Sequence, residues 1–305
     1  MRALVTGGAG FIGSHLVGRL LALGHVVRVV DDFSTGKRQN LAPMACPELE
    51  VIEADIRGGW QLREVAAGCE VIFHEAAIVS VPYSVENPQE THDVNLQGTL
   101  NVLEAARHAK VRRLVFASSA AVYGDAPGLP KHEGMLPTPI SPYGLEKLTG
   151  EHYLTIFARL YGVETVSLRY FNVFGPRQDP TSAYSGVISI FADRARRGEP
   201  LTIFGDGLAY RDFVYVDDVV EANLLAAAAP EAAGHVFNVA RGEKTTLLDL
   251  AAMIGRIVGR DLVVRHEAAR AGDIAESLAD IGRARARLGY APTVTVKEGL
   301  QRLLG

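Results

Sequence analysis

The chain has 305 residues, of which 48% are hydrophobic and 22% are charged, and this composition excludes a disordered or fibrous protein. Its 31 basic and 35 acidic residues give a formal net charge of −4, which argues against a nucleic-acid or acidic-membrane partner. Two cysteines, Cys46 and Cys69, and apolar runs far shorter than the roughly 18 residues of a membrane span favour a cytoplasmic protein with no membrane partner.

Short β-branched runs alternate with longer amphipathic segments through the first half of the chain. The runs that predict strands are Ala3–Thr6, Val26–Asp31, Leu49–Glu53, Glu70–Glu75, Arg112–Ser118 and Glu164–Arg169. Because parallel strands are joined by helices that cover both faces of the sheet, this order predicts a doubly wound α/β (Rossmann) domain over residues 1–172. Residues 173–305 have shorter, irregular elements and predict a smaller C-terminal α+β domain. We expect a return to the large sheet around residues 209–240, through a strand at Val214–Val216 and a helix at Asp217–Ala228.

A glycine-rich segment, TGGAGFIG (6–13), lies between the first predicted strand and a helix at Ser14–Leu23. In that context the helix amides and the helix dipole can hold a pyrophosphate, and the glycines let the backbone approach it. The second strand ends at Asp31, where a carboxylate can accept hydrogen bonds from the adenosine ribose. The sequence therefore predicts NAD as cofactor, while Lys37 and Arg38 leave NADP as an alternative.

The segment SPYGLEK (141–147) predicts the start of a helix with Ser141 as its N-cap. Tyr143 and Lys147 then share one face, and an ammonium group near a phenol is expected to lower the pKa of the phenol toward neutrality. Ser118–Ser119 end the fifth predicted strand, and ligands bind at the carboxyl ends of strands in open α/β sheets. This spacing indicates a catalytic group at that end of the sheet.

His74 and the acidic residues do not indicate a metal site. No set of His, Cys, Asp or Glu has the spacing of metal ligands, and His74 is expected to be a buried structural histidine. We therefore expect no metal.

A set of motifs carries a resemblance to a known family. These motifs are TGGAGFIG, Asp31, FHEAA (73–77), VNLQGTLNVLEAA (94–106), SSAAVYGD (118–125), SPYGLEK and LRYFNVFGPR (168–177). Together they resemble the extended short-chain dehydrogenases/reductases of the NAD-dependent epimerase/dehydratase family. Within it the chain is similar to UDP-glucose (UDP-galactose) and UDP-N-acetylglucosamine 4-epimerases, from Met1 to about Leu288.

The resemblance implies roles for individual residues. Tyr143 would be the catalytic base, Lys147 would bind the nicotinamide ribose and tune Tyr143, and Ser119 would hydrogen-bond the sugar O4. The residues implied to bind NAD are Gly7, Gly10, Phe11, Ile12, Asp31, Asp32, Ser34, Thr35, Gly36, Asp55, Ile56, Ala76, Ala77, Ile78, Asn95, Ser118, Tyr143, Lys147 and Tyr170. Residues 173–305 would mainly bind the nucleotide sugar, and the implied substrate residues are Ser119, Tyr143, Asn172, Gly186, Val187, Phe204, Arg211, Arg270, Asp273 and Ser277.

The residues beside Ser119 narrow the reaction that the resemblance implies. Relatives that dehydrate a nucleotide sugar carry an Asp-Glu pair there, and decarboxylating relatives carry a glutamate, whereas this chain has Ala120 and Ala121. The remaining groups, the Tyr143 phenol, the Ser119 hydroxyl and NAD, suffice for epimerisation at C4 of a UDP-hexose through a transient 4-keto sugar. A UDP-glucuronate 4-epimerase, another nucleotide-sugar oxidoreductase that releases NADH, and an inactive NAD-sensing protein remain alternatives.

Two further expectations concern the sugar and the assembly. In the resembling family, the residue seven positions after the diphosphate arginine lies beside the sugar C2 substituent, and Ser277 stands there after Arg270. A serine leaves room for an N-acetyl group, although Ser277 could instead be a solvated loop residue. The helices around Glu90–Ala109 and Tyr143–Tyr161 carry apolar residues on more than one side, which predicts a homodimer; ordinary core packing is the alternative.

Overall fold

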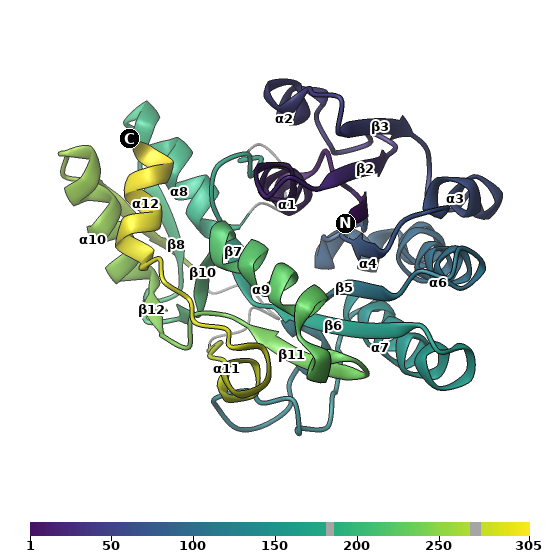
Figure 1. Cartoon of the computed structure of the whole chain (residues 1–305). Coiled ribbons are helices and arrows are strands. Elements are labelled where there is room, and N and C mark those ends of the chain that lie inside the picture. The colour runs from purple at the N-terminus through teal and green to yellow at the C-terminus, as the bar shows by residue number, and fades with distance from the viewer. Residues whose placement is uncertain (181–185, 269–275) are drawn as a thin grey trace.

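A parallel sheet of seven strands forms the frame of the protein, and the computed structural model describes residues 1–180, 186–268 and 276–305 (Figure 1). The strand order is β11-β6-β5-β4-β1-β2-β3. The strands are β1 (Arg2–Thr6), β2 (Val26–Asp31), β3 (Leu49–Glu53), β4 (Val71–His74), β5 (Arg113–Ser119), β6 (Glu164–Tyr170) and β11 (His235–Val239). This topology confirms the doubly wound α/β prediction.

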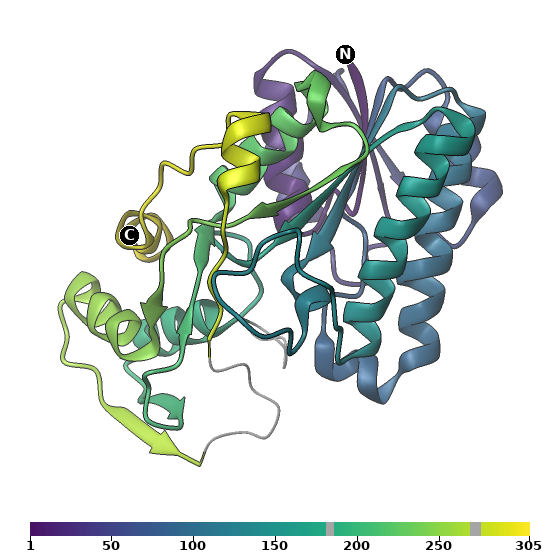
Figure 2. The same ribbon diagram turned by 90° about the horizontal axis from the view of Figure 1, so that it is seen from below.

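Helices cover both faces of the sheet, because the buried strands are apolar on both sides. The helices of this half are α1 (Phe11–Ala22), α2 (Arg38–Leu41), α3 (Gly59–Ala66), α4 (Val81–Glu86), α5 (Pro88–His92), α6 (Gly98–His108), α7 (Pro142–Tyr161), α9 (Val216–Ala228) and α11 (Gly282–Leu288). Helices α3, α6 and α7 bury one face around Leu103 and Phe157, and α1 and α9 bury the other around Leu16 and Val219. In Figure 2 the long helices α6 and α7, in blue and teal, run side by side at the edge of the molecule.

The smaller half has its own core and lies beside the sheet in Figure 1. Three pairs of short strands form it: β7 (Asn172–Phe174) with β10 (Phe213–Tyr215), β8 (Leu201–Phe204) with β13 (Val264–Glu267), and β9 (Tyr210–Arg211) with β12 (Thr245–Thr246). They pack against α8 (Val187–Arg197), α10 (Leu247–Val258) and α12 (Val296–Leu304). Among the described residues, no helix combines the length and the apolar character that crossing a membrane requires.

The predicted return strand at Val214–Val216 is wrong, since these residues do not join the large sheet. Phe213 and Tyr215 hold β10 in the smaller half, where both rings make edge contacts with Phe174 at centroid distances of 6.4 and 5.5 Å. The strand that returns is β11, which pairs in parallel with β6, while α9 packs on α1, β5 and β6. The helix at Asp217–Ala228 therefore lies where it was expected, and a different strand follows it.

Candidate active site

The glycine-rich turn after β1 has the backbone geometry of a phosphate-binding loop. Gly7 has a φ of +68°, and a Cβ there would lie 2.7 Å from the amide nitrogen of Ala76. A Cβ on Gly13 would lie 2.2 Å from the Gly7 carbonyl oxygen, so both positions require glycine. Within the described residues, no side chain caps α1 at Gly10, and the first amides of the helix can therefore bind an anion. These features fit the pyrophosphate of a dinucleotide.

Asp31 connects this turn to the loop that follows β2. Its carboxylate accepts hydrogen bonds from the amides of Ala9 and Phe33, each at 2.9 Å, and burial raises its pKa. Asp32 in turn accepts from the amide and hydroxyl of Ser34, at 3.0 and 2.6 Å. Gly36 lies against Asp31, so the loop wraps around the carboxylate that is predicted to bind the ribose.

Lys37 and Arg38, the basic residues that leave NADP as an alternative cofactor, both have acidic partners. Lys37 forms an ion pair of 2.6 Å with Asp179, and Arg38 forms one with Glu53. A 2′-phosphate would have to displace these carboxylates and face Asp31, so the arrangement favours NAD.

The other residues predicted to bind NAD lie near the carboxyl ends of β3, β4, β5 and β6. Ala76, Ala77 and Ile78 follow β4, and Asp55 and Ile56 follow β3. The Asn95 side chain accepts from the Ile78 amide at 2.8 Å and donates to the Ile78 carbonyl and to Glu146 at 3.0 and 2.8 Å. Asn95 therefore holds the loop after β4 in place. Direct contacts of these residues with NAD stay predictions.

Ser119, Tyr143 and Lys147 meet at the carboxyl end of β5. Ser141 caps α7 by accepting from the Gly144 amide at 3.1 Å, which confirms the predicted helix start. The Ser119 side chain lies near enough to the Tyr143 hydroxyl to lower its pKa, and the Lys147 ammonium lies 5.8 Å from the centre of the Tyr143 ring. Tyr143 is 7% exposed, so a phenol and a serine hydroxyl converge in a largely dry site.

The expectation that Lys147 lowers the pKa of Tyr143 is wrong for the protein alone. Burial raises the pKa of Tyr143 to about 12 and lowers that of Lys147 to about 8. The Lys147 ammonium donates instead to the Ala117 carbonyl at 2.8 Å. Desolvation of the two groups therefore outweighs their mutual effect.

Two polar residues near this site, Glu75 and Asn223, were not predicted from the sequence. Glu75 follows β4 directly and accepts from the Tyr170 hydroxyl at 2.8 Å, and that hydroxyl accepts from the Asn223 amide at 2.7 Å. Burial raises the pKa of Glu75 to about 7. The signal available was a charged residue directly after a short, mostly apolar strand, within FHEAA. Ser118, predicted to contact NAD, donates its hydroxyl to Glu151 at 2.5 Å.

The residues predicted to bind the sugar nucleotide lie in the smaller half. Asn172 and Phe204 are in β7 and β8, and Gly186 and Val187 begin α8. The Arg211 side chain and the Ser277 amide both donate to the Tyr210 carbonyl, at 3.0 and 3.1 Å, so these two predicted residues are neighbours. Arg270 and Asp273 lie outside the described residues.

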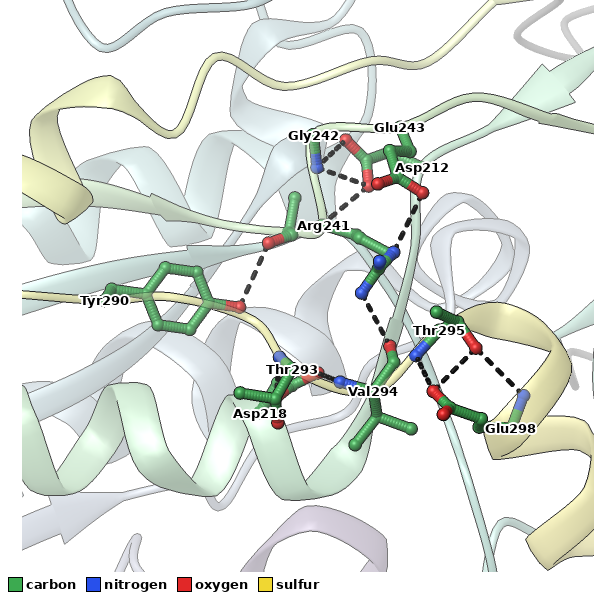
Figure 3. Close-up of polar contacts among 11 residues, drawn as sticks. Asp212, Asp218, Arg241, Gly242, Glu243, Tyr290, Thr293, Val294, Thr295 and Glu298 are labelled. Atoms are coloured by element: carbon green, nitrogen blue, oxygen red, sulfur yellow. Dashed lines mark hydrogen bonds and ion pairs between the residues drawn. The ribbon is translucent and has the colours of Figure 1, made fainter.

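Asp212 holds together the segments around Arg211 (Figure 3). Its buried carboxylate accepts from the amides of Arg241 and Gly242, at distances from 2.9 to 3.2 Å. It also accepts from the amide of Ala279, at 3.1 Å. Burial raises its pKa to about 6 despite these donors. Asp218 accepts in the same way from the amide of Thr293, at 2.8 Å. Two buried carboxylates thus fix the strand that carries Arg211 and the C-terminal segment beside it.

The comparisons with known proteins agree with this geometry. Residues 3–240 match the model of the NAD dependent epimerase/dehydratase family. The UDP-glucose 4-epimerase of Mycolicibacterium smegmatis is 42% identical over 307 residues, covering 98% of this chain and 96% of that protein. The structure of UDP-glucose 4-epimerase from Thermotoga maritima with UDP-glucose superposes with a TM-score of 0.94 at 40% identity, covering 100% of this chain and 97% of that one.

A second similar structure is a UDP-N-acetylglucosamine 4-epimerase from Methanobrevibacter ruminantium M1, in complex with UDP-N-acetylmuramic acid. It has a TM-score of 0.96 and 37% identity, and the similarity covers 99% of this chain and 96% of that one. These similarities extend through both halves of the molecule.

The pH dependence of protein stability tests the burial of His74, at the end of β4 beneath this site. His74 is buried between the hydroxyls of Thr6 and Thr99, at 2.7 and 2.9 Å, and burial lowers its pKa to about 3. The native state thus excludes a proton that the unfolded state binds below about pH 6.5, so His74 makes stability fall as the pH decreases. Between pH 7.5 and 4.5, urea unfolding should show wild type losing about 2–3 kcal/mol more than His74→Gln. Equal losses of stability in wild type and His74→Gln would contradict the burial of a neutral His74. His108→Gln, at an exposed position of α6, is the control and should behave like wild type.

Proposed function

The chain belongs to the NAD-dependent epimerase/dehydratase family, and we propose that it inverts C4 of a UDP-hexose. The observation that carries the proposal is the meeting of Tyr143, Ser119 and Lys147 at the end of β5. The next two positions are alanines, Ala120 and Ala121, and offer no carboxylate for dehydration or decarboxylation. The relatives named above are 4-epimerases of UDP-sugars, which supports the same chemistry here.

NAD is the cofactor of this family, and the residues of the nucleotide site fit it. The uncapped start of α1 and Asp31 would hold the pyrophosphate and the adenosine ribose, and Lys147 would contact the nicotinamide ribose. Bound NAD supplies a hydride acceptor that can return the hydride, and its oxidised ring adds a positive charge. We assign residues 1–172, with the returning α9 and β11, to NAD and the rest of residues 173–305 mainly to the nucleotide sugar.

Tyr143 would take the O4 proton when C4 becomes a carbonyl and would return it after the 4-keto sugar turns over. Ser119 would hold O4 against the phenol. Burial keeps Tyr143 protonated in the protein alone, so its action as a base depends on positive charge beside it, from Lys147 and the oxidised cofactor. Because oxidation and reduction occur in one site, no net redox change follows, and turnover needs no added NAD.

Substitution of the phenol tests this assignment. Tyr143→Phe should reduce conversion of UDP-galactose to UDP-glucose by about 10²–10⁴-fold, because the proton acceptor is lost, while NAD stays bound. Ser119→Ala should be milder, since it removes a hydrogen bond worth about 1–3 kcal/mol. Product chromatography measures both, with UDP-glucuronate as an additional substrate to test that alternative. Retention of more than about a tenth of the activity by Tyr143→Phe would refute the role.

The sugar pocket provides a second test. We propose that UDP-N-acetylglucosamine and UDP-N-acetylgalactosamine are accepted beside the plain hexoses, because Ser277 neighbours Arg211 and leaves room at C2. Ser277→Tyr should lower activity on the N-acetylated pair by roughly 10–200-fold through steric exclusion, and should leave the plain pair unchanged. Ser277→Ala is the matched control and should retain both pairs. Equal activity of Ser277→Tyr and wild type on the N-acetylated pair would remove Ser277 from the pocket.

The exposed face of α7 supports a homodimer, and a cytoplasmic location stays a prediction. Leu145, Ile156 and Leu160 lie at helical spacing and are 55%, 47% and 67% exposed, and α7 packs beside α6 at the edge of the molecule. An apolar stripe of this kind is typical of an interface. Wild type should sediment at twice the chain mass, and Ile156→Lys with Leu160→Lys should sediment as a monomer. Val263→Lys, at an exposed position of the smaller half, should remain dimeric. A wild-type monomer at micromolar concentration would contradict the proposal.

A further inference from the structure

Glu75 is a carboxylate at the nicotinamide end of the site to which the proposed reaction gives no role. Its amide donates to the Thr6 carbonyl at 3.1 Å, which anchors it beside the phosphate-binding turn. The register pairs His74 with Phe116, so Glu75 and Ala117 are lateral neighbours at the ends of β4 and β5. The Ala117 carbonyl holds the Lys147 ammonium. Adjacent strands are about 4.8 Å apart, so Glu75 and Lys147 lie at the same end of the sheet, and their charges affect each other.

The hydrogen-bond chain behind Glu75 has a fixed direction. The Asn223 amide group donates to the Val219 carbonyl at 2.9 Å and to the Tyr170 hydroxyl at 2.7 Å. The Tyr170 hydroxyl, having accepted this bond, donates its hydrogen to Oε1 of Glu75 at 2.8 Å. Asn223 is fully buried and Tyr170 nearly so. A carboxylate that receives a donor from a buried chain is favoured in its charged form.

The charges around Glu75 come from several elements. Among the carboxylates, Glu75 does most to raise the pKa of Lys147 against burial, ahead of Glu146 on α7. Lys147 in turn lowers the pKa of Glu75, and the charge of Glu75 raises the pKa of Tyr143. His74 faces the same lysine and is held neutral by its burial.

We propose that Glu75 is a positioning residue of the redox site: its carboxylate, fixed by Tyr170, holds the charge of Lys147 and favours the oxidised, cationic nicotinamide over the reduced one. A fixed anion stabilises a nearby cation, and only the oxidised ring carries a positive charge. An enzyme that must begin each turnover with oxidised cofactor benefits from this bias. The inference rests on the proposed contacts of Tyr143, Lys147 and Tyr170 with NAD, and not on the identity of the sugar.

The test compares binding of the two redox forms to cofactor-stripped protein by calorimetry, without any sugar. Glu75→Gln keeps the acceptor for Tyr170 and removes the charge. At pH 7.5 it should lower the preference for NAD⁺ over NADH by about tenfold relative to wild type. At pH 5.0 Glu75 is protonated in wild type, because its pKa is about 7, and the two proteins should show the same preference. Glu104→Gln, which removes a charge on the exposed side of α6, is the matched control.

A second variant keeps the inference testable if Glu75→Gln does not fold. Tyr170→Phe retains the carboxylate and removes its donor, so the pH at which the preference for NAD⁺ appears should move upward. Equal preferences in Glu75→Gln, Glu104→Gln and wild type at pH 7.5 would overturn the proposal. Equal weakening of NAD⁺ and NADH would also overturn it, because that result indicates a structural role only. Failure of the proposed sugar chemistry would be visible in Tyr143→Phe and would leave these binding ratios unaffected.

Discussion

The buried ion pair between Glu151 on α7 and Arg169 on β6 fixes the helix that carries Tyr143 and Lys147, which we propose to be catalytic. Arg169 donates to both carboxylate oxygens, at 2.9 and 2.7 Å, and Ser118 of β5 donates to one of them. Both charged side chains are about 5% exposed or less. A charge left without its partner at such a depth is costly, so the bidentate geometry allows one register between helix and strands. Tyr143 and Lys147, earlier on the same helix, are therefore placed by an interaction about two turns and one turn away, respectively.

In each half of the molecule, a buried carboxylate fixes loops by accepting hydrogen bonds from several backbone amides. Asp31 joins the phosphate-binding turn to the loop after β2, and Asp212 joins three segments around Arg211. Each carboxylate loses hydration on burial and regains hydrogen bonds from amides that would otherwise be unsatisfied. Loops that carry the residues proposed to bind ligands become rigid in this way without regular secondary structure, and the proposed site needs that rigidity.

The local parts of the fold and site could be predicted from the sequence. The glycine-rich turn and the capped start of α7 follow from spacing alone, because glycine tolerance and N-capping depend on a few adjacent residues. The place of Phe213–Tyr215 could not be predicted, because a short apolar run does not show which sheet will pair with it. The hydrogen bonds from Asn223 to Tyr170 and from Tyr170 to Glu75 join residues that are 53 and 95 positions apart, respectively. No local sequence pattern predicts such contacts.

The pKa of Tyr143 shows where spacing fails as a guide to chemistry. A tyrosine and a lysine four residues apart suggest mutual stabilisation, and that holds where both remain hydrated. Here both side chains are buried. Desolvation raises the pKa of Tyr143 to about 12, away from neutrality, and lowers the pKa of Lys147 to about 8, toward neutrality. The pair therefore needs further charges to act near neutral pH. Glu75 supplies the negative charge that keeps Lys147 protonated, at the expense of a higher pKa for Tyr143. With the proposed cofactor bound beside Tyr143, a cationic nicotinamide would offset that second effect, so the phenol would be activated only when oxidised cofactor is in place.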